Sequence, residues 1–345
     1  MRCLFRFNLG GEIVSGEIER AQGLGHAVRC VTLADELAGG AGAEILLVAD
    51  RNPVAEAYLA DAGHPFVLGA DEVDAARSFA PQVIVIDINH LEARRIERLR
   101  AIAPVVNLAP RGLPKFYADA TISNVVADDM PQPADARPRR WHRGPEYGIV
   151  RPQFRSLRAA ALSDSHRVAV LMGGLDQAGL TAAVIEQLAA LAEPFALDVV
   201  VGKLNPHANA LSGRLAKLGG ESRLYVDPPN VHEILGRASV AIVGTGNVVD
   251  ETLTMGVPTV CIGLSSFHDL RGRELERLGV AVYAGRAGSA PVGKIVGELL
   301  RDDGRRAELQ RRAIASFDGL GCARAAAIVR EFARDRASQI QMKQA

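Results

Sequence analysis

Short runs of β-branched residues alternate with longer helical patterns along this chain, and the alternation breaks once and then begins again. In the first half, predicted strands cover residues 1–7, 44–49, 82–88 and 105–108. In the second half, they cover residues 167–172, 197–201, 240–243 and 259–262, with helices over 180–192 and 230–237. Alternating strands and helices build parallel sheets with helices on both faces. We therefore predict an α/β fold of two Rossmann-like, doubly wound domains with a ligand cleft between them.

The break in the pattern falls around residues 131–145, where prolines gather among arginines and the periodicity is lost. We expect a linker from there to about residue 165. The expected division is an N-terminal domain over 1–160, a C-terminal domain over 161–325, and a last helix and tail over 326–345. In that last part, residues 339–345 are expected to be a frayed tail. A length of 345 residues fits two domains of about 150 residues each.

Charge and cysteine usage exclude several classes of protein. The chain carries 40 basic and 40 acidic side chains, so its overall field does not favour a nucleic-acid partner. The arginines of residues 137–143 are interpreted as part of a solvated linker. No stretch approaches the roughly 18 apolar residues of a membrane-spanning helix, and the four cysteines lack partners at zinc-binding spacing. We expect a cytoplasmic protein without membrane insertion, metal or other cofactor, and the oligomeric state stays open.

The segment over residues 23–34, GLGHAVRCVTLA, follows the first strand after a loop and opens a helix. Glycines there let the backbone approach a ligand, and the helix start offers amide donors. Gly25 precedes His26 at this start, and Arg29 lies one turn further along. A neutral imidazole in such a place can act as a general base. A plain glycine loop with a capping histidine is the better explanation of this motif when it is taken alone.

Two other strand ends point to a site. The strand over 82–88 is apolar on both faces and ends near an acid, Asp87, as expected of a central parallel strand that opens onto a site. Gly173 and Gly174 follow the strand over 167–172 and precede a helix. This glycine pair can hold a phosphate with its amides, or it can simply form a tight turn.

The segment over residues 243–258 is the most specific. A strand ends in Gly244, Thr245 and Gly246, and a helix that begins near Asn247 carries Glu251 before Gly-x-Pro returns the chain to the next strand. Amides and the threonine hydroxyl at a helix start can bind a diphosphate, while a carboxylate along the helix can accept hydrogen bonds from both ribose hydroxyls. The alternative is that the acids in this helix are ordinary surface residues.

Taken together, these segments resemble the UDP-sugar hydrolases of pseudaminic-acid biosynthesis, which are related to spore-coat polysaccharide proteins and to the GT-B glycosyltransferase that makes lipid II. The likeness covers most of the chain. The matching stretches are residues 23–34, 147–154, 172–176, 230–258 and 318–321, in matching order and spacing. The resemblance implies a GT-B-like fold and metal-independent hydrolysis of a UDP-linked diacetamido-trideoxy sugar, in nonulosonic acid or surface polysaccharide biosynthesis.

The resemblance also implies roles for individual residues. His26 would be the catalytic residue that activates or positions water, with Gly25 and Arg29 beside it. The diphosphate would lie along Gly173, Gly174, Gly244, Thr245 and Gly246. Asn247 would lie beside these five residues. Glu251 would hold the ribose, and Tyr147, Arg151 and His268 would help to shape the substrate site, with His268 near the place of a family glutamine.

The chain departs from the family pattern on the sugar side. The loop over residues 8–22 is longer than usual, the family's aspartate pair after residue 106 is missing, and the tyrosine that shortly follows the central aspartate is absent after Asp87. The sequence therefore leaves the sugar open. Hydrolysis is the leading hypothesis, a glycosyltransferase with a UDP-sugar donor is the alternative, and a non-catalytic nucleotide-sugar binding protein is a second alternative.

Overall fold

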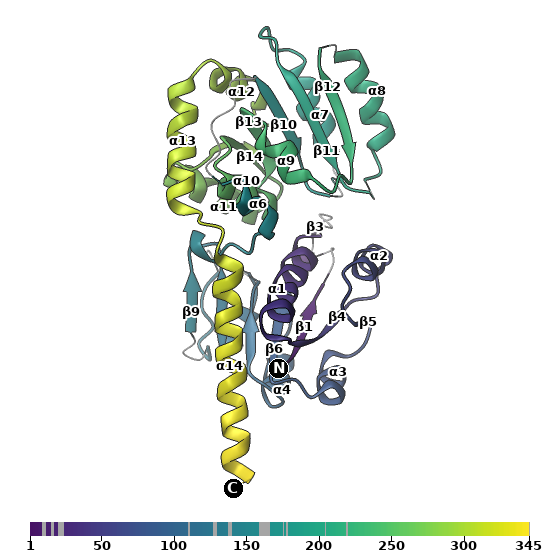
Figure 1. Ribbon diagram of the computed structural model, residues 1–345, viewed down its shortest axis with the longest axis vertical. Helices are drawn as coiled ribbons and strands as arrows, with labels where there is room; N and C mark the ends of the chain where they lie inside the picture. The colour runs from purple at the N-terminus through teal and green to yellow at the C-terminus, as the bar shows by residue number, and fades with distance from the viewer. Residues whose placement is uncertain are drawn as a thin grey trace. The chain divides into compact units, whose positions relative to one another are not determined.

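The computed structural model groups the chain into two compact units, each with its own parallel sheet (Figure 1). The first unit contains Met1–Glu12, Leu24–Ile149 and Leu320–Ala345, and the second contains Ile13–Gly23 and Val150–Gly319. The structure describes residues 1–8, 12–14, 17–19, 24–109, 111–126, 130–136, 140–158, 166–174, 176, 179–203, 205–218 and 220–344.

The first unit is built on a 7-stranded sheet in the order β5-β4-β1-β6-β7-β8-β9, in which every pair is parallel. Its strands are β1 (Arg2–Phe7), β4 (Glu44–Ala49), β5 (Phe66–Leu68), β6 (Val83–Asp87), β7 (Val105–Asn107), β8 (Ala120–Ser123) and β9 (Arg140–Arg143). All residues of β6 are buried because helices cover both faces of the sheet. The carboxyl ends of β1 and β6 meet at Phe7 and Asp87.

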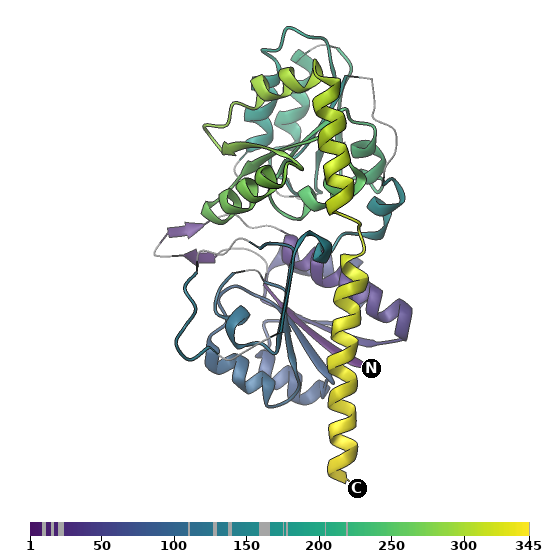
Figure 2. The ribbon, with the colours of Figure 1, turned by 90° about the vertical axis from the view of Figure 1, so that its left-hand side faces the viewer.

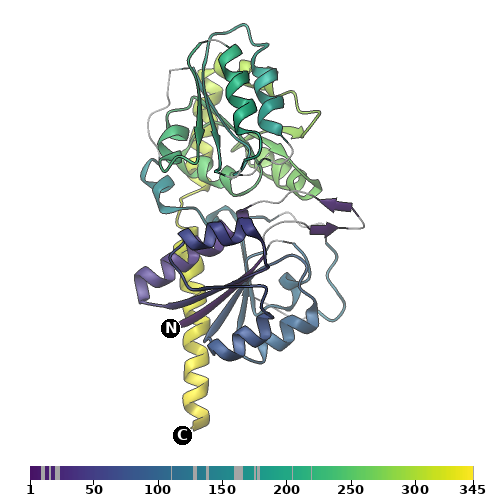
Figure 3. The ribbon, with the colours of Figure 1, turned by 90° about the vertical axis from the view of Figure 1, so that its right-hand side faces the viewer.

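Helices lie on both sides of this sheet (Figure 3). They are α1 (Gly25–Ala41), α2 (Pro53–Asp61), α3 (Glu72–Phe79), α4 (Ala93–Arg100), α5 (Pro114–Tyr117), η1 (Pro145–Tyr147) and α14 (Gly321–Gln344). Local sequence defines their ends. The side chains of Asn52 and Asp71 cap the starts of α2 and α3, and Gly42 ends α1 in the left-handed conformation that glycine adopts easily.

The last helix, α14, packs on the core of the first unit although it follows the second in sequence. Cys322, Ala326 and Val329 on α14 join the same buried cluster as residues of α1 and β1. The expected frayed tail over residues 339–345 is wrong as far as Gln344, because α14 continues to that residue and its C-terminal end projects beyond the rest of this unit (Figures 1 and 2).

The second unit has a 6-stranded parallel sheet in the order β12-β11-β10-β13-β14-β15. Its strands are β10 (Arg167–Leu171), β11 (Ala196–Val201), β12 (Ser222–Val226), β13 (Val240–Gly244), β14 (Thr259–Gly263) and β15 (Val282–Arg286). Its helices are α6 (Pro152–Ser156), α7 (Leu180–Leu188), α8 (Ala208–Leu218), α9 (Val231–Gly236), α10 (Asn247–Met255), α11 (Ser266–Leu278), α12 (Val292–Leu300) and α13 (Asp303–Ser316). Separate hydrophobic clusters fill the two faces of the sheet. A short separate sheet pairs β2 (Glu12–Val14) with β3 (Glu17–Glu19).

The prediction of two doubly wound α/β halves is confirmed. The expected linker is wrong in several places, because η1 and α6 fall within it and Arg140–Arg143 form β9, an edge strand that pairs in parallel with β8. Its residues are more exposed than those of the central strands, which explains why the hydrophobic pattern did not reveal it. The four cysteines are buried free thiols. Within the described ranges, no helix combines the length and apolar character needed to cross a membrane.

Candidate functional site

His26 lies in the first turn of α1, one residue after the helix begins at Gly25. Leu24 precedes the helix and makes no side-chain cap hydrogen bond. Gly23, the other glycine of the predicted motif, lies outside the described residues. The side chain of His26 is 21% exposed. The helix start is therefore a place where an imidazole can reach a ligand.

The side chain of His26 is held by a carboxylate that the sequence analysis did not connect with it. The Nδ1 atom of His26 lies 2.6 Å from Oδ1 of Asp87, the fully buried last residue of β6. An ionised carboxylate only accepts hydrogen bonds, so the shared proton resides on Nδ1. In the neutral imidazole this leaves the lone pair on Nε2. The pair therefore presents Nε2 of His26 as a base.

Arg29 completes this group, and we name His26, Arg29 and Asp87 the histidine cluster. The guanidinium of Arg29 donates through Nε to Oδ2 and through one terminal nitrogen to Oδ1 of Asp87, both at 2.9 Å. Burial raises the pKa of Asp87, but the nearby Arg29 and His26 outweigh it and lower the pKa to about 2. Asp87 is thus ionised over the whole ordinary pH range.

The lowered pKa of Asp87 predicts an acid-dependent loss of stability. A pKa of about 2 in the folded chain, against an ordinary 3.8, stabilises the folded state above pH 4 and ceases to do so as pH falls toward 2. The expected contribution is about 2 kcal/mol. We expect urea unfolding of Asp87→Asn to depend less on pH than that of the parent protein between pH 5 and pH 2. Equal pH dependence in both proteins would contradict this.

In the second unit, α10 begins at the carboxyl end of β13 with a glycine at its N-cap position. Gly246 stands at the N-cap position and provides no side-chain cap, and a Cβ atom built on it meets nothing within 4 Å. A helix leaves its first amides without intrahelical acceptors, here including those of Asn247 and Val248. Gly256 ends the helix in the left-handed conformation, as expected for the predicted return of the chain.

Thr245 uses both of its hydrogen-bond donors within the protein, whereas we expected its hydroxyl to bind a phosphate. Its amide donates to the carbonyl of Ile262 at 3.1 Å, and its hydroxyl donates to the carbonyl of His268 at 3.1 Å. The hydrogen bond of the amide joins the end of β13 to β14, and that of the hydroxyl holds it against the first turn of α11, where Ser265 caps the amide of His268. A phosphate role for Thr245 stays a prediction. The amides of the first turn of α10 are the better candidates in this arrangement.

Glu251 is buried rather than a surface acid, and it is paired with Arg151. The guanidinium of Arg151 donates to both carboxylate oxygens of Glu251, at 2.7 and 3.0 Å. The side chain of Glu251 is 3% exposed and that of Arg151 is 34% exposed. Arg151 also lies over the ring of Phe154. Ribose hydroxyls could therefore reach Glu251 only beside or in place of Arg151, and the ribose role stays a prediction.

The glycine pair after β10 borders a helix start that is already closed. Asp176 accepts hydrogen bonds from the amides of Leu180 and Thr181, each at 2.9 Å, and so occupies the N-terminus of α7. Gly173 adopts a positive φ of 95°, and the carbonyl of Gly174 accepts a hydrogen bond from Gly202 at 3.1 Å. A carboxylate at these amides competes with any phosphate. Of the two helix starts predicted to hold the diphosphate, α10 is thus the better candidate.

The remaining predicted residues have structural surroundings of their own. Tyr147 lies in η1, packs on the core of the first unit and meets the ring of His142 edge-on at 5.7 Å. His268 lies in the first turn of α11 and is half-buried. Substrate roles for both stay predictions. Asn107, where the family's aspartates are missing, is fully buried and binds the amide and carbonyl of Ala109.

Asp87 is the residue of the candidate site whose contact with His26 the sequence did not reveal. Its position at the end of a fully apolar strand pointed to a site, yet nothing in the sequence showed its pairing with His26, 61 residues away. Predicting this contact would have required the knowledge that β1 and β6 pair in parallel. Within the described ranges, no group of three or more His, Cys, Asp and Glu side chains is arranged to hold a metal ion.

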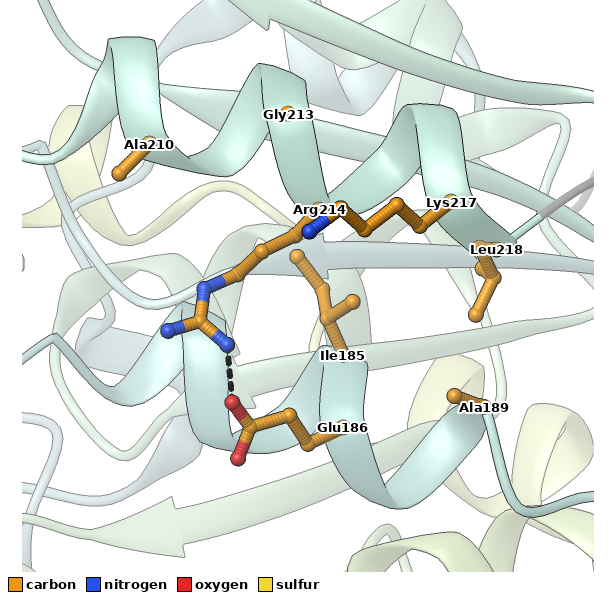
Figure 4. A pocket seen from close by; sticks show the side chains of 8 residues that line it. All are labelled: Ile185, Glu186, Ala189, Ala210, Gly213, Arg214, Lys217 and Leu218. Carbon is orange, nitrogen blue, oxygen red and sulfur yellow. Dashed lines mark hydrogen bonds and ion pairs between the residues drawn. The ribbon is translucent and has the colours of Figure 1, made fainter.

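A surface groove of about 570 Å³ lies between α7 and α8 (Figure 4). Arg214 and Glu186 form an ion pair across it. Its lining residues are Ile185, Glu186, Ala189, Ala210, Gly213, Arg214, Lys217 and Leu218. None of them is a predicted site residue, and they come from α7, the residue after it, and α8. The groove therefore does not belong to the candidate site.

Sequence comparison finds a distant relative of this chain. No family model matches the chain. An uncharacterised protein of Methanocaldococcus jannaschii is 22% identical over 265 residues, which cover 72% of this chain and 54% of that protein. The chain thus spans about half the length of this relative.

Solved structures match over nearly the whole chain. The structure of MurG from Acinetobacter baumannii matches with a TM-score of 0.64 at 13% identity, over 96% of this chain and 100% of that one. The calicheamicin glycosyltransferase CalG4 matches with a TM-score of 0.58 at 17% identity, over 96% and 98% of the two chains. With its two parallel sheets and interleaved helices, the chain has the GT-B fold that these proteins share.

Proposed function

We propose that this protein is an enzyme that hydrolyses a nucleotide-activated sugar, with His26 as the general base. The observation that carries the proposal is the 2.6 Å contact between Nδ1 of His26 and the buried carboxylate of Asp87. A carboxylate in this position orients an imidazole, selects its tautomer and stabilises the imidazolium that forms when it takes a proton. Arg29 keeps that carboxylate in place with two hydrogen bonds.

The reaction needs one deprotonation and one leaving group. Nε2 of His26 removes a proton from water while the water oxygen forms a bond with the anomeric carbon. The bond between that carbon and the diphosphate oxygen breaks, and its electron pair leaves with the nucleoside diphosphate. The imidazolium then returns its proton to solvent. Asp87 stays ionised throughout and stabilises the positive charge on the ring.

The second unit supplies the chemistry for the leaving group. The N-terminus of α10 offers backbone amides at the positive end of a helix dipole, which favours the negative charge of a diphosphate. The acid in its first turn, Asp250, is neutralised by Arg271 at 2.8 Å. The proposal thus assigns the base to the first unit and the diphosphate to the second. UDP is the leading nucleotide because of the sequence resemblance.

A glycosyltransferase is the second candidate. The same base can deprotonate an acceptor hydroxyl instead of water, and the solved structures with this fold include the calicheamicin glycosyltransferase CalG4. Hydrolysis leads because the sequence resembles UDP-sugar hydrolases over several ordered segments. The two reactions share the base, the diphosphate site and the departing nucleotide, and they differ only in the hydroxyl that attacks.

The deciding experiment measures free nucleotide released from a panel of UDP-, GDP- and CMP-sugars, with and without added acceptor alcohols. We expect release of UDP from a UDP-sugar without acceptor. Release only with acceptor would select the transferase, and binding measured by calorimetry without release would select a non-catalytic binding protein. Absence of both binding and release across the panel would overturn the proposed function.

A substitution at the N-cap of α10 should separate stability from ligand binding. Gly246 has an extended conformation that other residues adopt, with open space at its Cβ position. In Gly246→Asp, the new carboxylate should cap the helix and stabilise the protein by about 1 kcal/mol. The same carboxylate should occupy the amides and repel a diphosphate, so UDP affinity should fall by about tenfold or more. Thermal unfolding and calorimetry measure the two effects.

Gly246→Ala is the matched control because it fills the same space without a capping group. It should change UDP affinity by less than about threefold. The assignment of the diphosphate to α10 fails if Gly246→Asp stabilises the protein while UDP binds as tightly as before.

A further inference from the structure

Arg271 is among the most deeply buried charged side chains that the structure describes. It lies on α11 and is 1% exposed. Its guanidinium donates to Asp250 on α10 at 2.8 Å and to Glu274, one turn along α11, at 3.2 Å. Both acids are also buried. We name Asp250, Arg271 and Glu274 the buried triad, and it joins α10 to α11 inside the second unit.

A buried triad of this kind adds little to the free energy of unfolding, because burying its charges costs about as much as their attraction returns. Removing three charged groups from water costs several kcal/mol for each ion, which their mutual attraction only offsets when the geometry is good. Apolar side chains of similar volume often stabilise a protein as well or better. Geometry is what an arginine fork adds, because it fixes the direction and distance of the carboxylates that it binds. The triad therefore calls for an explanation other than stability.

The position of the triad suggests that explanation. Asp250 lies in the first turn of α10, whose N-terminus is the proposed diphosphate site. Arg271 lies one turn after His268, whose carbonyl accepts the hydroxyl of Thr245. The starts of α10 and α11 are thus tied twice, once by Thr245 at the strand end and once by Arg271 one turn below. Glu251, the neighbour of Asp250, is held from another side by Arg151.

We propose that Arg271 is a positioning residue that holds the starts of α10 and α11 in the arrangement needed to bind the diphosphate of the substrate. This rests on the proposed function of α10. Arg271 acts through Asp250 on the amides of the helix start and does not touch the ligand itself. A displacement of about 1 Å at a binding group is enough to lower a rate by about a hundredfold. Loss of the triad should therefore weaken the binding of the ligand even when the protein stays stable.

The test replaces the whole triad with apolar residues, as Asp250→Leu, Arg271→Met and Glu274→Leu together. We expect a melting temperature close to that of the parent protein, faster hydrogen exchange at the amides of residues 250–255, and about tenfold weaker binding of UDP. A role in stability alone predicts unchanged exchange and unchanged affinity once stability is retained. If the triple variant does not fold, Arg271→Lys keeps the charge but loses the fork and should show the same two effects to a smaller degree.

A matched control exists in the same unit. Arg167 binds both oxygens of the fully buried Asp198, at 3.2 Å each, but at the amino end of β10, away from the helix starts. Arg167→Met with Asp198→Leu should leave exchange in α10 and UDP binding unchanged. The positioning role is overturned if exchange at residues 250–255 in the triad variant equals that in the control. If the parent protein binds no nucleotide, the proposed function fails, while exchange in α10 still decides whether Arg271 holds the helix.

Discussion

Replacing His26 with alanine is expected to lower the kcat for nucleotide-sugar turnover by about a thousandfold. The variant loses the only group of the histidine cluster that can take a proton from water, since Asp87 stays ionised but fully buried and Arg29 is a cation. UDP affinity should change by less than about threefold, because the proposed diphosphate site lies in the other unit. Steady-state release of UDP and calorimetry with UDP measure the two quantities.

His64 offers a matched control for this prediction. Its Nε2 atom lies 2.7 Å from a carboxylate oxygen of Asp35, so it forms a second imidazole–carboxylate pair in the same unit. It is held by an exposed acid rather than by the end of a central strand. His64→Ala should leave kcat within about twofold of the parent protein. Turnover that survives His26→Ala would remove His26 from the role of base, whatever the result at His64.

The fold could be predicted from the sequence because its strongest signal is local. Strands buried on both faces, such as β6, are continuous apolar runs, and the pattern restarts after one break. The edge strand β9 has no such signal, because half of its residues are exposed and arginines surround its tryptophan. The full length of α14 could not be predicted either. Its polar C-terminal end suggested fraying, whereas the structure continues the helix to Gln344.

The candidate site could be predicted only in part, because pairings between distant side chains leave no local pattern. Glycines at helix starts were visible, but the sequence could not show that Asp176 caps α7 while α10 begins at Gly246 without a side-chain cap. Nor could it show that Glu251 faces Arg151, which lies 100 positions earlier. His26 was identified from its motif. Its carboxylate partner depended on the parallel pairing of β1 with β6.

The second large effect is expected from Asp87→Asn, which changes one atom of the histidine cluster. An asparagine has one acceptor oxygen, and Arg29 directs two donors at this position. Because these donors point at both oxygen positions, the amide NH2 group meets an N–H of Arg29 whichever way it turns, and when it takes the Oδ1 position it points toward Nδ1 of His26. Nδ1 must then accept a hydrogen bond, so the ring proton moves to Nε2 and the base is lost. We expect kcat to fall by about a thousandfold with little change in UDP affinity.

This argument about the tautomer predicts a rescue that a simple loss of charge does not. In the double variant Arg29→Met with Asp87→Asn, no guanidinium competes for the amide oxygen. The amide can turn so that its oxygen accepts from Nδ1 of His26, which returns the lone pair to Nε2. The kcat of the double variant should exceed that of Asp87→Asn by about tenfold. A double variant slower than both single variants would show that the negative charge of Asp87, rather than its choice of tautomer, activates His26.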